Sequence, residues 1–503
     1  MKKSTQMKKA TQKKKNFFKQ DQVIYFQLGL IFLAALILRF SPMLWSRDFW
    51  YDEAFTGILL KSSWGEMNQM IFADVHPPLY YWLAKPVSAL FGYSSLGIRF
   101  FSVLMSLATL ISLFWVGKKM FSPRTGLLAV LFLAFSPFAI EYAQEARMYS
   151  LFGFLMLWAV WFFYQALEKN RRQDWIFWGI LAGLAFLTHY LSLFFFVIFY
   201  LVFVAWRIIF DRKIWWRAFL GEKGFWLGVG TIGVFFLGWL KFFITHMLKG
   251  NLGWIDVTYL SVLPSTIQIF LFGHPPGTGG VPTANAFRGI FDGSSIGLLV
   301  LIGGLVLLTL NWQKNQKRKE LFLLSGLSLG TLVFVALLSH LNIKLYVSRY
   351  FMPSALLIYL FLAGSLLSFF PEKKAWLWTA FFFALLLAFL KPISFASDWN
   401  QIAKLQEEGL IDKESIFITS GPFDYATARY YFGEENVRYY NRSNPEEDFS
   451  GWVVVGNENR ISNIEELKTI PQAVVVNGSC WWLGVNLEEI FRTEKMSVCR
   501  IKD

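Results

Sequence analysis

An adjacent pair of carboxylic acids, Asp52 and Glu53, stands just after the first long apolar stretch of the chain. The segment Arg47–Phe55 around the pair also holds an arginine, a third acid and aromatic residues of the kind found at the bilayer–water boundary. Ionised groups at membrane depth are costly and usually functional, and a carboxylate there can take a proton from an attacking hydroxyl. The pair therefore predicts a catalytic site, whereas the alternative is an ordinary polar loop between membrane spans.

Further acidic, basic and aromatic residues occur at the ends of later apolar stretches, on the same predicted side of the membrane. Arginine and lysine bind phosphate groups, so acids and bases together at one membrane face suit a lipid substrate with a charged head. We predict three catalytic residues, Asp52, Glu53 and Glu145. The predicted substrate-binding residues are His76, Lys85, Glu141, Arg147, His189, Arg349 and Tyr350.

The composition is that of an integral membrane protein. Of the 503 residues, 55% are hydrophobic and 19% are aromatic, and apolar stretches of spanning length recur from Val23 to Leu390. The net charge of +14 comes from short Lys/Arg clusters between those stretches, which argues against nucleic-acid binding. Cys480 and Cys499 are too few for a disulfide framework or a zinc site.

The positions of the Lys/Arg clusters predict the topology. Because positive charge collects on the cytoplasmic side, the lysine-rich residues 1–20 form a cytoplasmic tail and the Asp52 segment lies outside. Residues 64–91 are broken by Pro and Gly, and we expect helices along the interface there. The eleven expected spans are Val23–Arg39, Leu96–Val116, Gly126–Ile140, Leu151–Leu167, Trp175–Leu187, Leu191–Ile208, Phe225–Met247, Ser295–Leu310, Leu321–Leu338, Met352–Phe370 and Trp376–Leu390.

Residues 395–503 differ in kind from the membrane part, residues 21–394. They hold 18 acids against 11 Lys and Arg, and short β-branched runs alternate with helix-like stretches such as Gln401–Glu408. The runs at Ile416–Thr419, Val453–Val455 and Val474–Val476 predict strands of a small soluble α/β domain. This domain follows an outward span, so it is expected outside the cytoplasm, where Cys480 and Cys499 could pair.

Five motifs occur in one order along the membrane part: Tyr51-Asp52-Glu53-Ala54, His76-Pro77-Pro78-Leu79-Tyr80-Tyr81, Gln144-Glu145-Ala146-Arg147-Met148-Tyr149, Thr188-His189-Tyr190 and Ser348-Arg349-Tyr350-Phe351-Met352-Pro353. The series resembles the GT-C glycosyltransferases of family 39, which include protein O-mannosyltransferases and lipid A aminoarabinose transferases. The resemblance covers roughly residues 20–395 and is strongest over residues 45–150.

The resemblance implies an inverting membrane glycosyltransferase with a sugar donor on a polyprenyl phosphate. Asp52 matches the acid proposed as general base, and Glu145 or Glu141 matches an acid of the second outer loop. His76 stands where some relatives have a lysine near the donor phosphate, and Arg147 and Arg349 match phosphate ligands by charge and motif position. Because such a donor carries one phosphate that Arg147 and Arg349 could neutralise, we expect no cofactor and no divalent metal. The expected acceptor is a protein, a lipid or an envelope glycan on the outer face of the cell membrane.

Other interpretations remain open from the sequence. The protein is alternatively a lipid or glycan flippase without catalysis, or a binding protein built on a decayed enzyme. Glu53 alternatively caps a helix or pairs with Arg47. Lys85 and Arg349 are alternatively interfacial anchors, and His189 is alternatively a hydrogen-bonded interfacial residue with no catalytic role.

Overall fold

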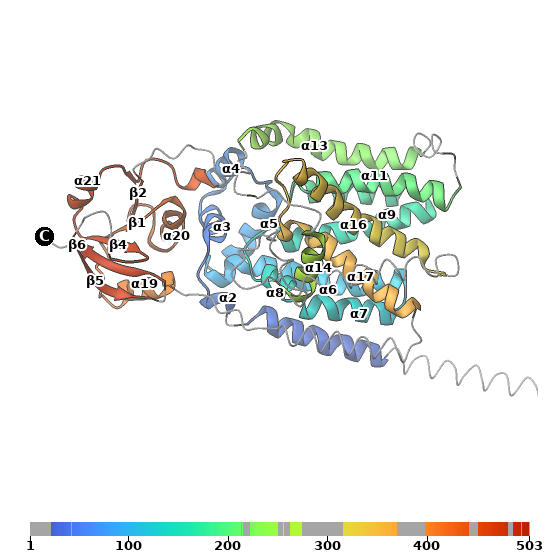
Figure 1. Ribbon diagram of the computed structural model, residues 1–503, viewed down its shortest axis with the longest axis horizontal. Coiled ribbons are helices and arrows are strands. Elements are labelled where there is room, and N and C mark those ends of the chain that lie inside the picture. The colour runs from blue at the N-terminus through green and yellow to red at the C-terminus, as the bar shows by residue number, and fades with distance from the viewer. Residues whose placement is uncertain are drawn as a thin grey trace, which may run out of the picture.

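The chain forms a helical bundle with a small α/β domain at one end (Figure 1). The computed structural model describes residues 22–41, 43–212, 214, 222–249, 255, 262–273, 315–369, 398–441, 451–480, 486–493 and 495–501. Short helices at the start of the chain lie between the bundle and the α/β domain (Figure 1). This layer contains the Asp52 segment.

Seven described helices are long and apolar enough to cross a membrane. They are Gln22–Arg39, α6 (Ser95–Met120), α9 (Tyr149–Lys169), α11 (Ser192–Ile209), α13 (Lys223–Lys249), α16 (Arg318–His340) and the unit Ser348–Phe369, which joins η2 (Ser348–Phe351) to α17 (Met352–Phe369). The pair α7 (Pro123–Phe135) and α8 (Pro137–Ala143) would make an eighth span, bent by 67°. Each of these coincides with an expected span.

The remaining expected spans are not settled by the described residues. The helix α10 (Arg172–Phe186) lies where a span was expected, but its 15 residues are fewer than the about 20 that cross a bilayer. The expected spans Ser295–Leu310 and Trp376–Leu390 lie outside the described residues. The short apolar helix α14 (Val262–Phe272) precedes both segments in the chain. The total of eleven therefore stays a prediction.

The bend between α7 and α8 has a local cause. Pro137 has no backbone N–H, so the carbonyl of Leu133 loses its helical partner. The fully buried Arg39 replaces it, donating to the carbonyls of Leu133 at 3.0 Å and Ala134 at 3.1 Å. The Arg39 Nε also donates to Ser106 Oγ at 2.9 Å. The first span thereby fixes the bend, which directs α8 toward the loop of residues 144–148.

Four short helices follow the first span: α2 (Met43–Ser46), α3 (Tyr51–Lys61), α4 (Trp64–Ala73) and α5 (Leu79–Ala89). None is long enough to cross a bilayer, as expected for interfacial helices. The start of α4 is a capping box, in which Ser63 and Glu66 each accept the other's backbone N–H. Because α3 and α4 are separated by only two residues, they form a rigid support for Asp52.

The C-terminal domain is a six-stranded sheet of order β3-β2-β1-β4-β6-β5. Its strands are β1 (Ile416–Thr419), β2 (Val437–Tyr440), β3 (Arg460–Ile461), β4 (Ala473–Asn477), β5 (Leu487–Arg492) and β6 (Ser497–Ile501). The first four are parallel to one another, β6 is antiparallel to β4, and β5 is antiparallel to β6. The helices are α19 (Asp398–Glu407), α20 (Pro422–Phe432), η3 (Trp452–Val454) and α21 (Ile464–Lys468).

The predicted α/β character of this domain is confirmed, with one error among its strands. The run Val453–Val455 is wrong as a strand, because its first residues belong to the 3-10 helix η3. Val454 and Val455 are buried, and the Val454 carbonyl accepts a hydrogen bond from Arg429, so tertiary packing outweighs β-branched preference here. Cys480 and Cys499, whose pairing the sequence left open, form a disulfide.

The C-terminal domain docks on α2 and α3 through specific contacts. The Asp48 carboxylate accepts the N–H groups of Trp399 at 2.7 Å and Asn400 at 3.0 Å, and so caps the first turn of α19. The ring of Tyr430 lies where a Cβ on Gly57 would stand, at 2.6 Å. Glycine at this position therefore allows α20 to pack closely on α3.

We propose that the N-terminal tail is cytoplasmic and the C-terminal domain is outside, because all the large Lys/Arg clusters between spans lie on one side. Both native cysteines are in the disulfide, so an introduced cysteine supplies the only free thiol. In intact cells a membrane-impermeant maleimide should label Leu410→Cys, which is exposed on the C-terminal domain, and should not label Arg171→Cys in a basic cluster. The reverse labelling pattern would overturn the proposed orientation.

Candidate active site

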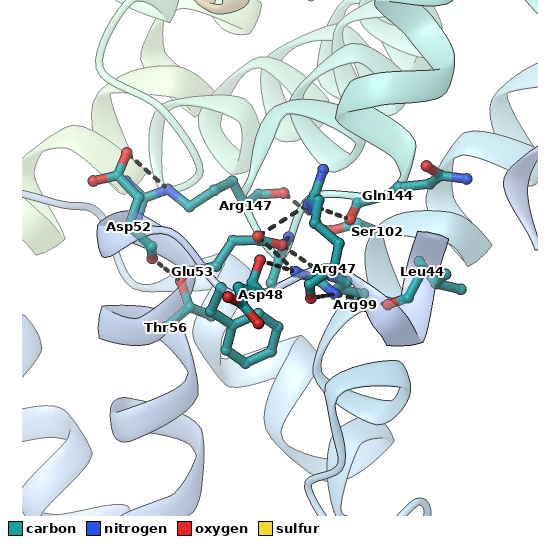
Figure 2. Close-up of polar contacts among 12 residues, drawn as sticks. Leu44, Arg47, Asp48, Asp52, Glu53, Thr56, Arg99, Ser102, Gln144 and Arg147 are labelled. Carbon is teal, nitrogen blue, oxygen red and sulfur yellow. Dashed lines mark hydrogen bonds and ion pairs between the residues drawn. The ribbon is translucent and has the colours of Figure 1, made fainter. Parts of the chain in front are cut away.

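Glu53 is fully buried and both of its carboxylate oxygens are occupied. Arg99 binds it with two hydrogen bonds, of 2.7 and 2.8 Å, and Arg47 adds a third of 2.9 Å (Figure 2). The backbone N–H of Ala146 donates at 3.0 Å. The alternative that Glu53 pairs with Arg47 is confirmed. With no free oxygen for a substrate proton, Glu53 has the geometry of a positioning residue instead of the catalytic one that we expected.

Arg99 links this carboxylate to the turn before α3. Its remaining N–H groups donate to the carbonyls of Leu44, Arg47 and Asp48 at 2.7, 3.0 and 3.1 Å. Burial alone would raise the pKa of Glu53, but the charges of Arg47 and Arg99 hold it below its ordinary value of 4.5. The sequence analysis missed Arg99, although a lone arginine in the first turn of an expected span is a visible signal.

Asp52 points away from this cluster and toward two other arginines. Its Oδ2 lies 3.9 Å from Arg147 Nε and 3.9 Å from Arg349 Nη2. The Asp52 side chain is 19% exposed, whereas those of the two arginines are 3% and 10% exposed. Distances of 3.9 Å make ion pairs but are too long for hydrogen bonds. The Asp52 carboxylate therefore pairs with the two guanidinium groups by charge.

Arg147 is held in place by the loop between α4 and α5 and by α5 itself. Its Nη2 lies 2.8 Å from His76 Nε2, and its Nη1 lies 3.4 Å from the Tyr81 hydroxyl. The other ring nitrogen of His76 lies 2.6 Å from Asp74 Oδ2. His76 was expected among the substrate-binding residues, but here it supports Arg147. Asp74 was not predicted, although it stands two residues before the His-Pro-Pro motif.

Arg349 comes from η2 and lies against aromatic rings. Its guanidinium carbon is 5.4 Å from the Trp50 ring centre and 5.7 Å from that of Tyr350. Tyr350 also stacks on Tyr149, with ring centres 6.3 Å apart. The expected pair Arg349 and Tyr350 is thus brought to the Asp52 site, with Trp50 as an exposed neighbour that the sequence analysis did not single out.

His189 belongs to the aromatic support behind Tyr350. Its ring is stacked on Phe152 at 5.2 Å and lies 4.7 Å from Tyr350, and its Nδ1 accepts the N–H of Leu191 at 3.1 Å. Burial lowers the pKa of His189 to about 3, and nearby cationic side chains contribute. A neutral, packed imidazole fits the alternative interpretation of a hydrogen-bonded interfacial residue.

Glu145 is the second acid near the arginines. Its side chain is buried, and among the described residues its Oε1 has no hydrogen-bond partner. Burial raises the pKa of Glu145 to about 8, and the charge of Glu53 adds to the effect. A carboxyl group of this kind is mainly protonated at neutral pH and can donate a hydrogen bond. Glu141 lies about one turn earlier, on α8, and the choice between the two stays open.

Lys85 does not join the site. It donates to the carbonyls of Leu60, at 2.7 Å, and Ser62 at the end of α3. Leu60 lies eight residues beyond Asp52, or about 12 Å along the helix. The structure therefore gives Lys85 the alternative role of a structural residue near the interface.

No group of three or more His, Cys, Asp or Glu side chains in the described part of the chain is arranged to hold a metal ion. The metal independence expected from the sequence stays a prediction. It is tested by chelation, since turnover should then be unchanged in EDTA.

The complete fold has a known counterpart. ArnT from Cupriavidus metallidurans, solved bound to undecaprenyl phosphate, superimposes with a TM-score of 0.61 at 13% identity over 94% of this chain and 97% of that chain. Its apo state gives a TM-score of 0.59 at 14% identity, over 93% and 97% of the two chains. The chain therefore shares the fold of this ArnT over nearly its whole length, including the C-terminal domain.

Sequence matches define the type more closely. Residues 75–221 match the family model described as dolichyl-phosphate-mannose-protein mannosyltransferase. Over 171 residues, 32% of each chain, the sequence is 26% identical to an undecaprenyl phosphate-alpha-4-amino-4-deoxy-L-arabinose arabinosyl transferase of Pseudomonas savastanoi pv. phaseolicola. A second such transferase, of Pseudomonas fluorescens, is 28% identical over 32% of this chain and 31% of its own length. The matches span about a third of these curated relatives. Over these stretches the chain is similar to transferases of the aminoarabinose transferase and protein mannosyltransferase type.

The buried position of Glu53 predicts a large stability cost when its charge is removed. Glu53→Gln would leave Arg47 and Arg99 buried without a counter-charge, at a cost of about 3–5 kcal/mol. The matched control is Glu168→Gln, which breaks a partly exposed pair with Lys319 and should cost ~0–1 kcal/mol. Unfolding in detergent, followed by loss of tryptophan fluorescence, compares the two variants. Equal stability of both would contradict the positioning role of Glu53.

Proposed function

We propose that the protein transfers a sugar from a polyprenyl-phosphate donor to a hydroxyl group on the outer face of the membrane. The observation that carries the proposal is the placement of two buried arginines, Arg147 and Arg349, on one partly exposed carboxylate, Asp52. An anion-binding pair beside a candidate base, next to interfacial helices, suits a lipid-linked phosphate donor. The isoprenoid tail would remain in the bilayer.

The donor phosphate would bind between Arg147 and Arg349. Both guanidinium groups are buried and approach the same point from different elements, the loop of residues 144–148 and η2. Such groups bind phosphate oxygens with charge-assisted hydrogen bonds. The structural neighbour from Cupriavidus metallidurans, which was solved bound to undecaprenyl phosphate, supports this donor class.

Asp52 would act as the general base. A phosphate that engages the two arginines replaces Asp52 as their anionic partner and leaves its carboxylate available to the acceptor. The acceptor oxygen attacks the anomeric carbon while its proton passes to Asp52. The bond from that carbon to the phosphate oxygen breaks, and its electron pair leaves with the polyprenyl phosphate. One displacement of this kind inverts the anomeric centre.

Glu145 would assist the departure of the phosphate. A carboxyl group whose pKa is raised to about 8 can donate a hydrogen bond to the oxygen that gains negative charge. We propose mannose or another hexose as the sugar, with the family model of residues 75–221 in support. The acceptor would be a protein, a lipid or an envelope glycan with a free hydroxyl.

The roles of Asp52 and Arg349 predict opposite kinetic effects. Asp52→Asn keeps the shape of the side chain but removes the base, so turnover should fall about 10²- to 10⁴-fold with donor binding retained. Arg349→Ala should mainly weaken donor binding, by about 1.5–3 kcal/mol for a lost charge-assisted hydrogen bond. Transfer of radiolabelled sugar in proteoliposomes measures turnover, and its dependence on donor concentration measures binding.

Asp211→Asn is the control for this pair, since Asp211 contacts Arg207 at the end of α11 and not the site. It should retain wild-type transfer. Wild-type turnover by Asp52→Asn would show that the base lies elsewhere, whereas lipid movement without any sugar transfer by the wild type would favour a flippase.

A further inference from the structure

A chain of three short hydrogen bonds joins the C-terminal domain to Arg147. The backbone N–H of Gly451 donates to Asp74 Oδ1 at 2.7 Å. The other oxygen of Asp74 lies 2.6 Å from His76 Nδ1, and His76 Nε2 lies 2.8 Å from Arg147 Nη2. Asp74 and Arg147 are 4% and 2% exposed. The bond from Gly451 to Asp74 is therefore buried, whereas the two bonds of His76 are partly buried.

The direction of each bond follows from the chemistry of its partners. A guanidinium group can only donate, so His76 Nε2 must accept from Arg147. The neutral imidazole then carries its proton on Nδ1 and donates it to Asp74. Burial alone would raise the pKa of Asp74, yet the contacts with His76 and Gly451 hold it below its ordinary value. One tautomer of His76 is thus selected by Asp74.

This chain has the shortest of the hydrogen bonds that orient Arg147. The two contacts of Arg147 Nη1, to the Tyr81 hydroxyl and the Asp52 carbonyl, are both 3.4 Å long. The bond of 2.8 Å to His76 is stronger, since hydrogen bonds weaken with distance. His76 therefore has the larger share in setting the plane of the guanidinium group that faces Asp52 Oδ2.

Gly451 reaches this position because it is glycine. Its φ of +88° is in the left-handed region, which residues with a side chain rarely adopt. A Cβ on Gly451 would also stand 2.3 Å from the hydroxyl of Tyr51, the neighbour of Asp52. Gly451 thus lies against both the Asp74 side chain and the start of α3.

We propose that the C-terminal domain sets the orientation of the phosphate-binding Arg147 through Gly451, Asp74 and His76. Asp74 and His76 are positioning residues, and the docked domain is part of the active site. The proposal rests on the proposed function for the phosphate-binding role of Arg147. The hydrogen-bonded chain itself is independent of that role and can be measured separately.

The first experiment changes the proton on His76. In Asp74→Asn the side-chain amide can accept from Gly451 only if its NH₂ group faces His76 Nδ1. That arrangement moves the imidazole proton to Nε2, where it opposes Arg147. Spectra of the ¹⁵N-labelled side chains of the five histidines should show one Nδ1–H tautomer in the wild type, assigned by its loss in His76→Gln. This signal should disappear in Asp74→Asn.

The control is Asp211→Asn, which alters the carboxylate contact with Arg207 at the end of α11 and touches neither His76 nor the C-terminal domain. It should leave the tautomer and the donor KM unchanged. Asp74→Asn should raise the donor KM roughly tenfold or more, as expected for loss of one hydrogen bond to a charged group, with a smaller change in kcat.

The second experiment approaches from the C-terminal domain. Gly451→Ala should move the backbone N–H of residue 451 away from Asp74. It should therefore raise the donor KM, as Asp74→Asn does. Gly456→Ala is its control, since Gly456 also has a positive φ, of +60°, but no atom within 4 Å of its added Cβ. Equal effects of the two substitutions would reduce the result to backbone strain and overturn the link to the domain.

The outcomes separate the two proposals. A retained Nδ1–H tautomer in Asp74→Asn would overturn the hydrogen-bonded chain. Loss of the Nδ1–H tautomer with an unchanged donor KM would show that the hydrogen-bonded chain does not influence donor binding. Absence of sugar transfer by the wild type would instead overturn the proposed function. In that case, polyprenyl-phosphate binding measured without turnover would still test the hydrogen-bonded chain, because Asp74→Asn should weaken it.

Discussion

The site depends on a buried carboxylate held by two arginines. Glu53 with Arg47 and Arg99 places three charges in a region without water, which is unfavourable unless every charge is paired and hydrogen-bonded. The structure meets this condition for Glu53 by adding the N–H of Ala146, and for Arg99 by adding three carbonyls. These contacts hold the turn before α3, the start of α6 and the loop that carries Arg147 in fixed positions relative to one another.

Helix geometry gives the two adjacent acids, Asp52 and Glu53, different surroundings. Consecutive residues of an α-helix point about 100° apart, so when Glu53 faces inward Asp52 must face a different side of α3. That side is bordered by Arg147 and Arg349, each anchored by its own support: the pair Asp74 and His76 for Arg147, and aromatic rings for Arg349. One acid of the pair therefore holds the structure together while the other remains accessible.

Much of this arrangement could be predicted from the sequence, because membrane spans and Lys/Arg clusters are strong signals. The expected topology also placed Asp52, Arg147 and Arg349 on one membrane face, and in the structure their side chains meet. The sequence does not report side-chain direction, so adjacent Asp52 and Glu53 were given the same catalytic role. It also concealed pairings between distant segments, such as Glu53 with Arg99, and the position of Lys85 at the far end of α3. The misread strand at Val453–Val455 has the same origin, since its conformation is decided by packing around Val454.

The central claim is that the two arginines bind the donor phosphate and release Asp52 for catalysis. It is tested most directly by an electron cryomicroscopy structure of the protein with a bound polyprenyl phosphate. The account predicts the phosphate within hydrogen-bond distance of both Arg147 and Arg349, with the Asp52 carboxylate turned away from them toward the acceptor side. A phosphate bound at Lys85 or at the opposite membrane face, with the ion pairs of Asp52 intact, would contradict it.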